Sequence, residues 1–268
     1  MSTLESIIDY APVKANRLKT SSLNNKMVNE YWTEVFEAKQ QGKLVCWYEG
    51  VAINPLMQAA DVAWVHGEAW SALLAARNGE ESAQNAAEQR GYLKELCSYA
   101  RTHIGCGVLA QNRGVEASGS SFADALGANQ LGERVPAPDM FISAYPYCST
   151  GQQWDEMLYR LFGKKIPIFN ISVPWIWGNK KDAGYLTGSE FKEATAYMVR
   201  QLRESIKFIE LQTGKKYAYD KLSEIMAYTK QAGKLRMEAM ELCRAKPGPA
   251  SFFDWTTSLA PVNFIKFS

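Results

Sequence analysis

Short apolar runs alternate with helical patterns over most of the chain. The runs are brief, rich in β-branched and aromatic residues and bounded by Gly, Asp or Pro, which predicts buried strands; they lie at 42–50, 61–67, 139–148 and 165–174. Apolar residues at helical spacing predict helices at 26–40, 54–60, 71–90 (interrupted near Asn78-Gly79) and 151–163. Strand, helix and strand at this spacing predict an α/β fold with a doubly wound parallel sheet and right-handed crossovers.

The pattern becomes helical in the last third. Residues 187–190 have the spacing of a capping box, and apolar positions then recur every three to five residues up to Thr213-Gly214. Asp220 is predicted to cap a second helix, and Pro247 to Pro249 end the helical region. We therefore expect an N-terminal helical segment (1–42), an α/β domain (43–186) and an added helical segment with a tail (187–268).

The middle of the chain carries a weaker signal. Residues 93–104 have apolar spacing that predicts a helix ending near Gly105, with Cys97 inside it. Residues 106–138 are rich in Gly, Ala, Asn and Ser, which predicts a long loop with room for one helix.

Composition narrows the class of protein. The chain has 268 residues, of which 47% are hydrophobic and 22% charged, as in an ordinary globular protein. A net charge of +2 gives no reason to expect a nucleic-acid partner. There is no apolar run of the roughly 20 residues needed to cross a membrane, and the first residues lack the pattern of a signal peptide, so we expect a cytoplasmic protein.

Five cysteines are too few and too dispersed for a disulfide framework, so they are thiols, ligands or core residues. Cys148 is the most informative, because it follows a predicted parallel strand and precedes a helix, where α/β sheets bind ligands. Backbone N–H groups at a helix N-terminus favour a thiolate and would also stabilise an anionic cofactor. The alternative is a cysteine that serves as a small apolar residue in a turn.

Other common site chemistries find little support in the sequence. A zinc site would need Cys97, His103, Cys106 and Cys148, but no C-x-x-C pair is present. With His66 and His103 a Ser-His-Asp hydrolase has the residues it needs, but G-x-S-x-G is missing. No phosphate-binding glycine motif follows a strand, so nothing indicates a nucleotide site.

The order of motifs resembles the family of 2-hydroxyacyl-CoA dehydratases and ATP-dependent benzoyl-CoA reductases, in particular their paired catalytic subunits. In that family one cluster cysteine lies in L-C-x-[FY]-[VA]-[RK] before I-G, matched by residues 96–101 and 104–105. A second follows an Asp-led strand and precedes a helix, matched by Asp139 to Cys148. The likeness continues through Val173-Pro174-Trp175 and the turn at 246–249, and so covers most of the chain.

This resemblance implies that Cys97 and Cys148 ligate a [4Fe–4S] cluster. It also implies a homologous second catalytic subunit, an iron–sulfur ATPase activator, reduced ferredoxin as electron source and an acyl-CoA substrate. Family members are longer, and their second α/β domain supplies a third cluster cysteine; Cys243 lies outside that context, so the role is not extended to it. Either another chain or ligand completes the cluster, the sequence is a fragment, or this subunit holds no cluster.

The two reactions of the family remain to be separated. The reductases reduce an aromatic ring, whereas the dehydratases expel a hydroxyl group as water from a ketyl radical. Aromatic residues at predicted strand ends favour a flat aromatic acyl group, and hence benzoyl-CoA reduction, unless they merely pack at the sheet edge; they are Trp47, Tyr48, Trp64, Trp70, Tyr145, Tyr147, Trp175 and Trp177. A dehydratase subunit and a cluster-free scaffold subunit are the alternatives.

Overall fold

The sheet is the centre of the fold. The structure is a computed structural model, and it describes residues 18, 20–50, 53–114, 121–144, 148–174, 188–252 and 254–255. Within these residues four parallel strands form one sheet in the order β2-β1-β3-β4. The strands fall inside the four apolar runs; they are β1 (Val45–Gly50), β2 (Ala63–His66), β3 (Met140–Ala144) and β4 (Ile168–Asn170).

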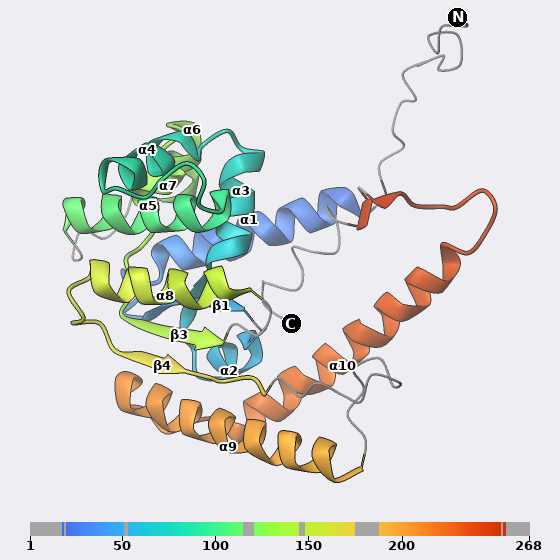
Figure 1. Ribbon diagram of the computed structural model, residues 1–268. Helices are drawn as coiled ribbons and strands as arrows, with labels where there is room; N and C mark the ends of the chain where they lie inside the picture. Colours follow the sequence, from blue (N-terminus) through green and yellow to red (C-terminus); the bar gives the residue numbers. More distant parts are fainter. Residues whose placement is uncertain are drawn as a thin grey trace, which may run out of the picture.

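The strand order identifies where a ligand would bind. From β1 the chain moves through α2 (Asn54–Ala59) to β2 at one edge, and from β3 it moves through α8 (Ser149–Leu161) to β4 at the other edge. Right-handed crossovers in opposite directions place α2 and α8 on opposite faces of the sheet, as Figure 1 shows. The predicted doubly wound α/β fold is confirmed, and its topological switch point lies between β1 and β3.

Helices cover both faces of the sheet. The connection from β2 to β3 holds five of them, stacked above the sheet beside α8 in Figure 1, while α9 and α10 lie below it. Among the described helices, none is both long and apolar enough to cross a membrane. The helices outside the two crossovers are α1 (Ser21–Glu37), α3 (Gly67–Ala76), α4 (Glu81–Gln89), α5 (Ser98–Arg113), α6 (Phe122–Gly127), α7 (Leu131–Arg134), α9 (Gly188–Thr213) and α10 (Tyr219–Leu242).

Two predictions about the middle of the chain are wrong. The helix around Cys97 does not end near Gly105 but begins at Ser98 and continues to Arg113. The predicted loop after Cys106 contains the second half of α5 and also α6 and α7. The physical reason is packing, because the glycines that suggested a loop let α5 lie very close to its neighbours: a methyl group on Gly105 would overlap the backbone of Ala83 in α4.

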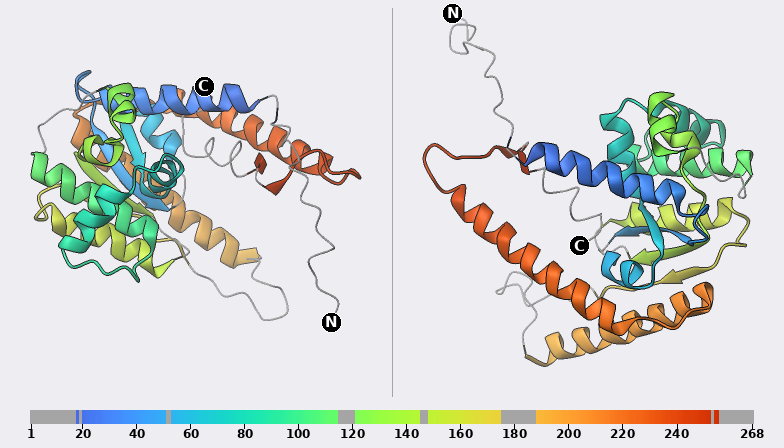
Figure 2. Two further views of the ribbon diagram at one scale, coloured as in Figure 1. Left: turned by 90° about the horizontal axis from the view of Figure 1, so that it is seen from above. Right: turned by 180° about the vertical axis from the view of Figure 1, so that it is seen from behind.

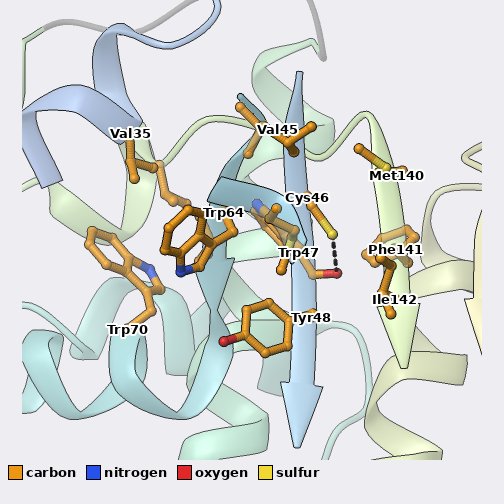
Figure 3. Close-up of a cluster of buried hydrophobic side chains, with 14 of the residues drawn as sticks. Val35, Val45, Cys46, Trp47, Tyr48, Trp64, Trp70, Met140, Phe141 and Ile142 are labelled. Carbon is orange, nitrogen blue, oxygen red and sulfur yellow. Dashed lines mark hydrogen bonds between the residues drawn. The ribbon is translucent and has the colours of Figure 1, made fainter. Parts of the chain in front are cut away.

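The aromatic side chains of the central strands belong to the core. Trp47, Tyr48, Trp64 and Trp70 are at most 1% exposed, and Figure 3 shows them beside the strand residues of β1 and β3. Trp47 Nε1 donates a hydrogen bond to the carbonyl oxygen of Pro136 at 3.0 Å. These four residues therefore fill the core, whereas the other four aromatic residues cited for a flat substrate lie outside the described part of the chain.

The last two helices pack on the face that carries α2. Tyr217 donates a hydrogen bond to the carbonyl oxygen of Leu56 at 3.0 Å, and the rings of Phe169 on β4 and Phe208 on α9 lie 5.6 Å apart. Figure 2 shows α10 running away from the sheet beyond this contact. Asp220 lies inside the first turn of α10, so its predicted role as the cap is wrong; Ala218 holds that position, and the predicted capping box begins at Thr187, outside the described residues.

Candidate functional site

Cys97 and Cys148 occupy equivalent positions on two helices. Cys97 is the N-cap of α5, and Cys148 is the N-cap of α8. Each carbonyl oxygen accepts a backbone hydrogen bond from the first turn, from Arg101 at 2.9 Å and from Gly151 at 3.0 Å. Both side chains are exposed. Each thiol therefore stands at the positive end of a helix dipole, where a negative charge is stabilised.

Contacts along α5 and α8 show that these helices are parallel and in register. Trp154 Nε1 donates to His103 Nδ1 at 3.1 Å, across 51 positions of the chain. Two turns further on, Gln111 Nε2 donates to the carbonyl oxygen of Leu161 at 2.9 Å, across 50 positions. Cys97 and Cys148 are likewise 51 positions apart, so the structure brings the two cysteines to the same level at one end of the helix pair.

This end of the helix pair lies at the carboxyl edge of the sheet. In Figure 1 β3 points toward the end at which α8 begins, and α5 runs alongside α8. Axes of packed helices are about 8–10 Å apart, a spacing that one bridging group can span. The two thiols therefore flank the region in which open α/β sheets bind their ligands.

The electrostatics favour a thiolate at Cys148. Hydrogen bonds from the side chain of Thr150 and from the backbone of Gly151 lower the pKa of the Cys148 thiol below its ordinary value. By contrast, burial raises the pKa of the Cys106 thiol to about 12 and that of the Cys46 thiol beyond this, so these two cysteines stay protonated.

Two thiols meet part of the donor requirement of an iron–sulfur cluster. Thiolates are the ligands that such clusters prefer, and both cysteines are exposed enough to accept one. Within the part of the chain that the structure describes, no group of three or more His, Cys, Asp or Glu side chains is placed to hold a metal ion. The arrangement therefore fits two of the ligands, and any further ligands would come from elsewhere.

A buried polar cluster lies under the two N-caps, and the sequence alone did not reveal it. Glu49 ends β1, and its Oε2 accepts a hydrogen bond from the backbone N–H of Glu68 at 3.2 Å, at the start of α3. Its Oε1 lies 3.0 Å from His103 Nδ1, and both side chains are fully buried. Asp155 on α8 is 2% exposed and Ser143 on β3 is 7% exposed. This cluster joins the elements that position both cysteines.

Burial decides the charge of this cluster. Desolvation raises the pKa of Glu49, and it raises the pKa of Asp155 to about 8 although Ser143 donates a hydrogen bond to it. Desolvation also lowers the pKa of His103 to about 3 and that of His66 to about 4. At neutral pH the cluster is therefore largely uncharged.

Gly67 makes room for the contact between Glu49 and His103. A methyl group at this position would overlap Glu49 Oε1 and His103 Nδ1. We expect Gly67→Ala to cost about 1–2 kcal/mol of the free energy of unfolding, because these side-chain ends must shift within a packed site. Denaturant unfolding measures this loss, with Gly127→Ala as a control at which nothing lies within 4 Å; equal stability of Gly67→Ala and the parent would contradict the expectation.

Comparison with known proteins identifies the family. The family model described as "2-hydroxyglutaryl-CoA dehydratase, D-component" matches residues 52–266, which is most of the chain and includes both cysteines. The chain belongs to this dehydratase family. The resemblance predicted from the motifs around Cys97 and Cys148 is thereby confirmed.

Curated relatives of this family member are named as subunits of CoA-thioester enzymes. The alpha subunit of (R)-2-hydroxyisocaproyl-CoA dehydratase from Clostridioides difficile is 29% identical over 89% of this chain and 52% of its own length. The lactoyl-CoA dehydratase subunit alpha of Anaerotignum propionicum is 28% identical over 81% and 48%. A benzoyl-CoA reductase subunit from Thauera aromatica is 26% identical over 61% and 32%. The chain spans about half the length of the dehydratase subunits that it matches.

Proposed function

We propose that this chain forms part of a 2-hydroxyacyl-CoA dehydratase subunit in which Cys97 and Cys148 are two ligands of a [4Fe–4S] cluster. The observation that carries the proposal is the pair of exposed cysteines at matching N-caps of α5 and α8. Two helix dipoles converge on one place there, which suits an anionic cofactor held by thiolates.

Two observations favour the dehydratase over the benzoyl-CoA reductase. The dehydratase subunits match a larger share of this chain, 81–89% against 61% for the reductase subunit. The aromatic residues that favoured a flat acyl group are in part core residues, since Trp47, Tyr48, Trp64 and Trp70 are buried. Benzoyl-CoA reduction is therefore the second candidate, supported by the match to the reductase subunit.

The chain's own residues would provide the framework of the site. Cys97 and Cys148 would hold the cluster, and the N–H groups of α5 and α8 would stabilise its negative charge. A cluster bound there would supply single electrons of low potential to a CoA thioester. As in the family that the sequence resembles, we propose a homologous second catalytic subunit, an iron–sulfur ATPase activator and reduced ferredoxin as partners.

Anaerobic reconstitution tests the cluster proposal. The full chain is incubated with ferrous iron and sulfide, and bound iron, acid-labile sulfide and visible absorbance are measured. Residues that only orient a metal ligand are each worth about 10- to 100-fold in affinity, so we expect Cys97→Ser and Cys148→Ser to lose at least as much. Cys243→Ser is the matched control, because this half-buried cysteine ends α10, away from the sheet edge.

The outcomes separate the alternatives. Iron that is retained by both serine variants contradicts the proposed ligands. A folded chain that takes up no iron supports a cluster-free scaffold subunit, and a colourless chain with bound zinc supports a structural metal site. If the cluster forms, turnover of a 2-hydroxyacyl-CoA against benzoyl-CoA by the assembled complex decides between the two reactions.

A further inference from the structure

Three buried polar atoms near the switch point have no hydrogen-bond partner in the described part of the protein. They are Glu49 Oε1, His103 Nε2 and Asp155 Oδ2. Most buried polar atoms in folded proteins are paired, and an unpaired one costs free energy. Three such atoms from three different elements in one place point to a role other than stabilising the fold.

The three residues lie directly under the cysteine pair. Glu49 is at the carboxyl end of β1, and His103 and Asp155 lie about two turns into the helices that Cys97 and Cys148 begin. Trp154 ties the two helices together at this level through its bond to His103. A charge in this cluster would therefore act on both thiols at once.

The contacts require a proton in this cluster. The indole N–H of Trp154 can only donate, so its bond to Nδ1 makes that atom an acceptor and leaves the ring proton of His103 on Nε2. Glu49 Oε1 lies 3.0 Å from the same Nδ1, and two acceptors this close repel each other unless Glu49 is protonated. The raised pKa values of Glu49 and Asp155 agree with protonated carboxyl groups.

We propose that Glu49, His103 and Asp155 form an internal proton-holding site beneath Cys97 and Cys148, which keeps this edge of the sheet free of negative charge. Glu49 and Asp155 are thus positioning residues that act on the cysteines through electrostatics. The inference deepens the proposed function and rests on it, since the negative charge of thiolates and of a bound cluster can then accumulate above the site without repulsion from below.

Other groups that face the cluster are consistent with this role. His66 at the end of β2 is uncharged at neutral pH, and Cys46 on β1 is a buried thiol. Glu68 at the start of α3 is half-buried and acts on both Glu49 and Cys148. Ser143 on β3 donates its hydrogen bond to Asp155. Glu68 is therefore the neighbouring carboxyl group whose charge a protonated cluster offsets least.

Infrared spectroscopy of the full chain tests the proposal without iron. We expect a carboxylic-acid C=O band at pH 7 that weakens in Glu49→Gln and in Asp155→Asn and disappears in the double variant. Glu156→Gln is the matched control, because this neighbour of Asp155 on α8 is exposed and paired with Arg160; it should leave the band unchanged. Absence of the band from the parent chain, which needs no variant to fold, would overturn the proposal.

The alkylation rate of Cys148 gives a second readout that a purely structural role would not predict. An amide replaces a neutral acid without changing charge, so Glu49→Gln and Asp155→Asn should alter the rate at pH 7 by less than about twofold, with the same pH midpoint. A shift of the midpoint to lower pH in both variants would reveal carboxylates and overturn the proposal. Both measurements use iron-free protein, so a failure of cluster binding would leave them interpretable.

Discussion

Replacing Gly105 by alanine is expected to lower the free energy of unfolding by about 3 kcal/mol. The added methyl group would overlap the carbonyl group of Ala83 and lie 3.0 Å from its Cα, so the backbones of α4 and α5 would have to separate. Overpacking of this kind costs about 1–3 kcal/mol, and backbone atoms yield less readily than side-chain ends, so we place it at the upper limit. Denaturant unfolding of the parent and the variant measures the difference.

Gly233→Ala is the matched control. Gly233 lies within α10 with nothing near its Cα, so alanine there should stabilise the chain by about 0.5–1 kcal/mol through helix propensity alone. Opposite signs at the two glycines would establish that contact with α4 is the cause. A Gly105→Ala chain as stable as its parent would show that α4 and α5 are not packed backbone to backbone. Because Gly105 lies about two turns from Cys97, the same variant should also weaken iron binding.

Strand positions were predictable because a buried parallel strand needs little more than a short apolar run. The runs containing Val45 to Gly50 and Met140 to Ala144 have no competing helical period. Helix α5 was misplaced because glycine usually marks a turn, whereas Gly105 and Gly107 serve here to admit α4 and α8. Local propensity cannot report such a contact, since the neighbour that requires the glycine lies far away in the sequence.

The two cysteines were predictable from motifs, but the cluster beneath them was not. Cys148 follows a strand, and Cys97 lies in a family-like segment, so both positions drew attention. Glu49 left one signal, a carboxyl group inside an otherwise apolar strand run, and Asp155 shares a helix face with the buried Trp154 and Leu158. Their convergence with His103 depends on the register of α5 and α8, which no local pattern specifies.

The stability of the protein is expected to fall as the pH rises from 6.5 to 8, and Asp155→Asn is expected to remove part of that fall. The pKa of Asp155 is raised to about 8 in the folded chain, against about 3.9 in an unfolded one. Between these values the folded state holds a proton that the unfolded state has lost, so each rise of one pH unit costs about 1.4 kcal/mol. Below about pH 3.9 this contribution is fully present, and above about pH 8 it is gone.

The two histidines determine the pH range in which Asp155 can be observed. His66 and His103 have pKa values lowered to about 4 and 3, so the unfolded state binds more protons than the folded state below about pH 6.5, and stability falls as the pH is lowered there. Above 6.5 they are neutral in both states, which leaves the buried acids to set the slope. Between pH 6.5 and 8 the parent should lose about 2 kcal/mol through Asp155, whereas the asparagine side chain of the variant cannot titrate. Glu156→Gln on the same helix should keep the slope of the parent; equal slopes for Asp155→Asn and the parent would show that Asp155 carries no extra proton in the folded protein.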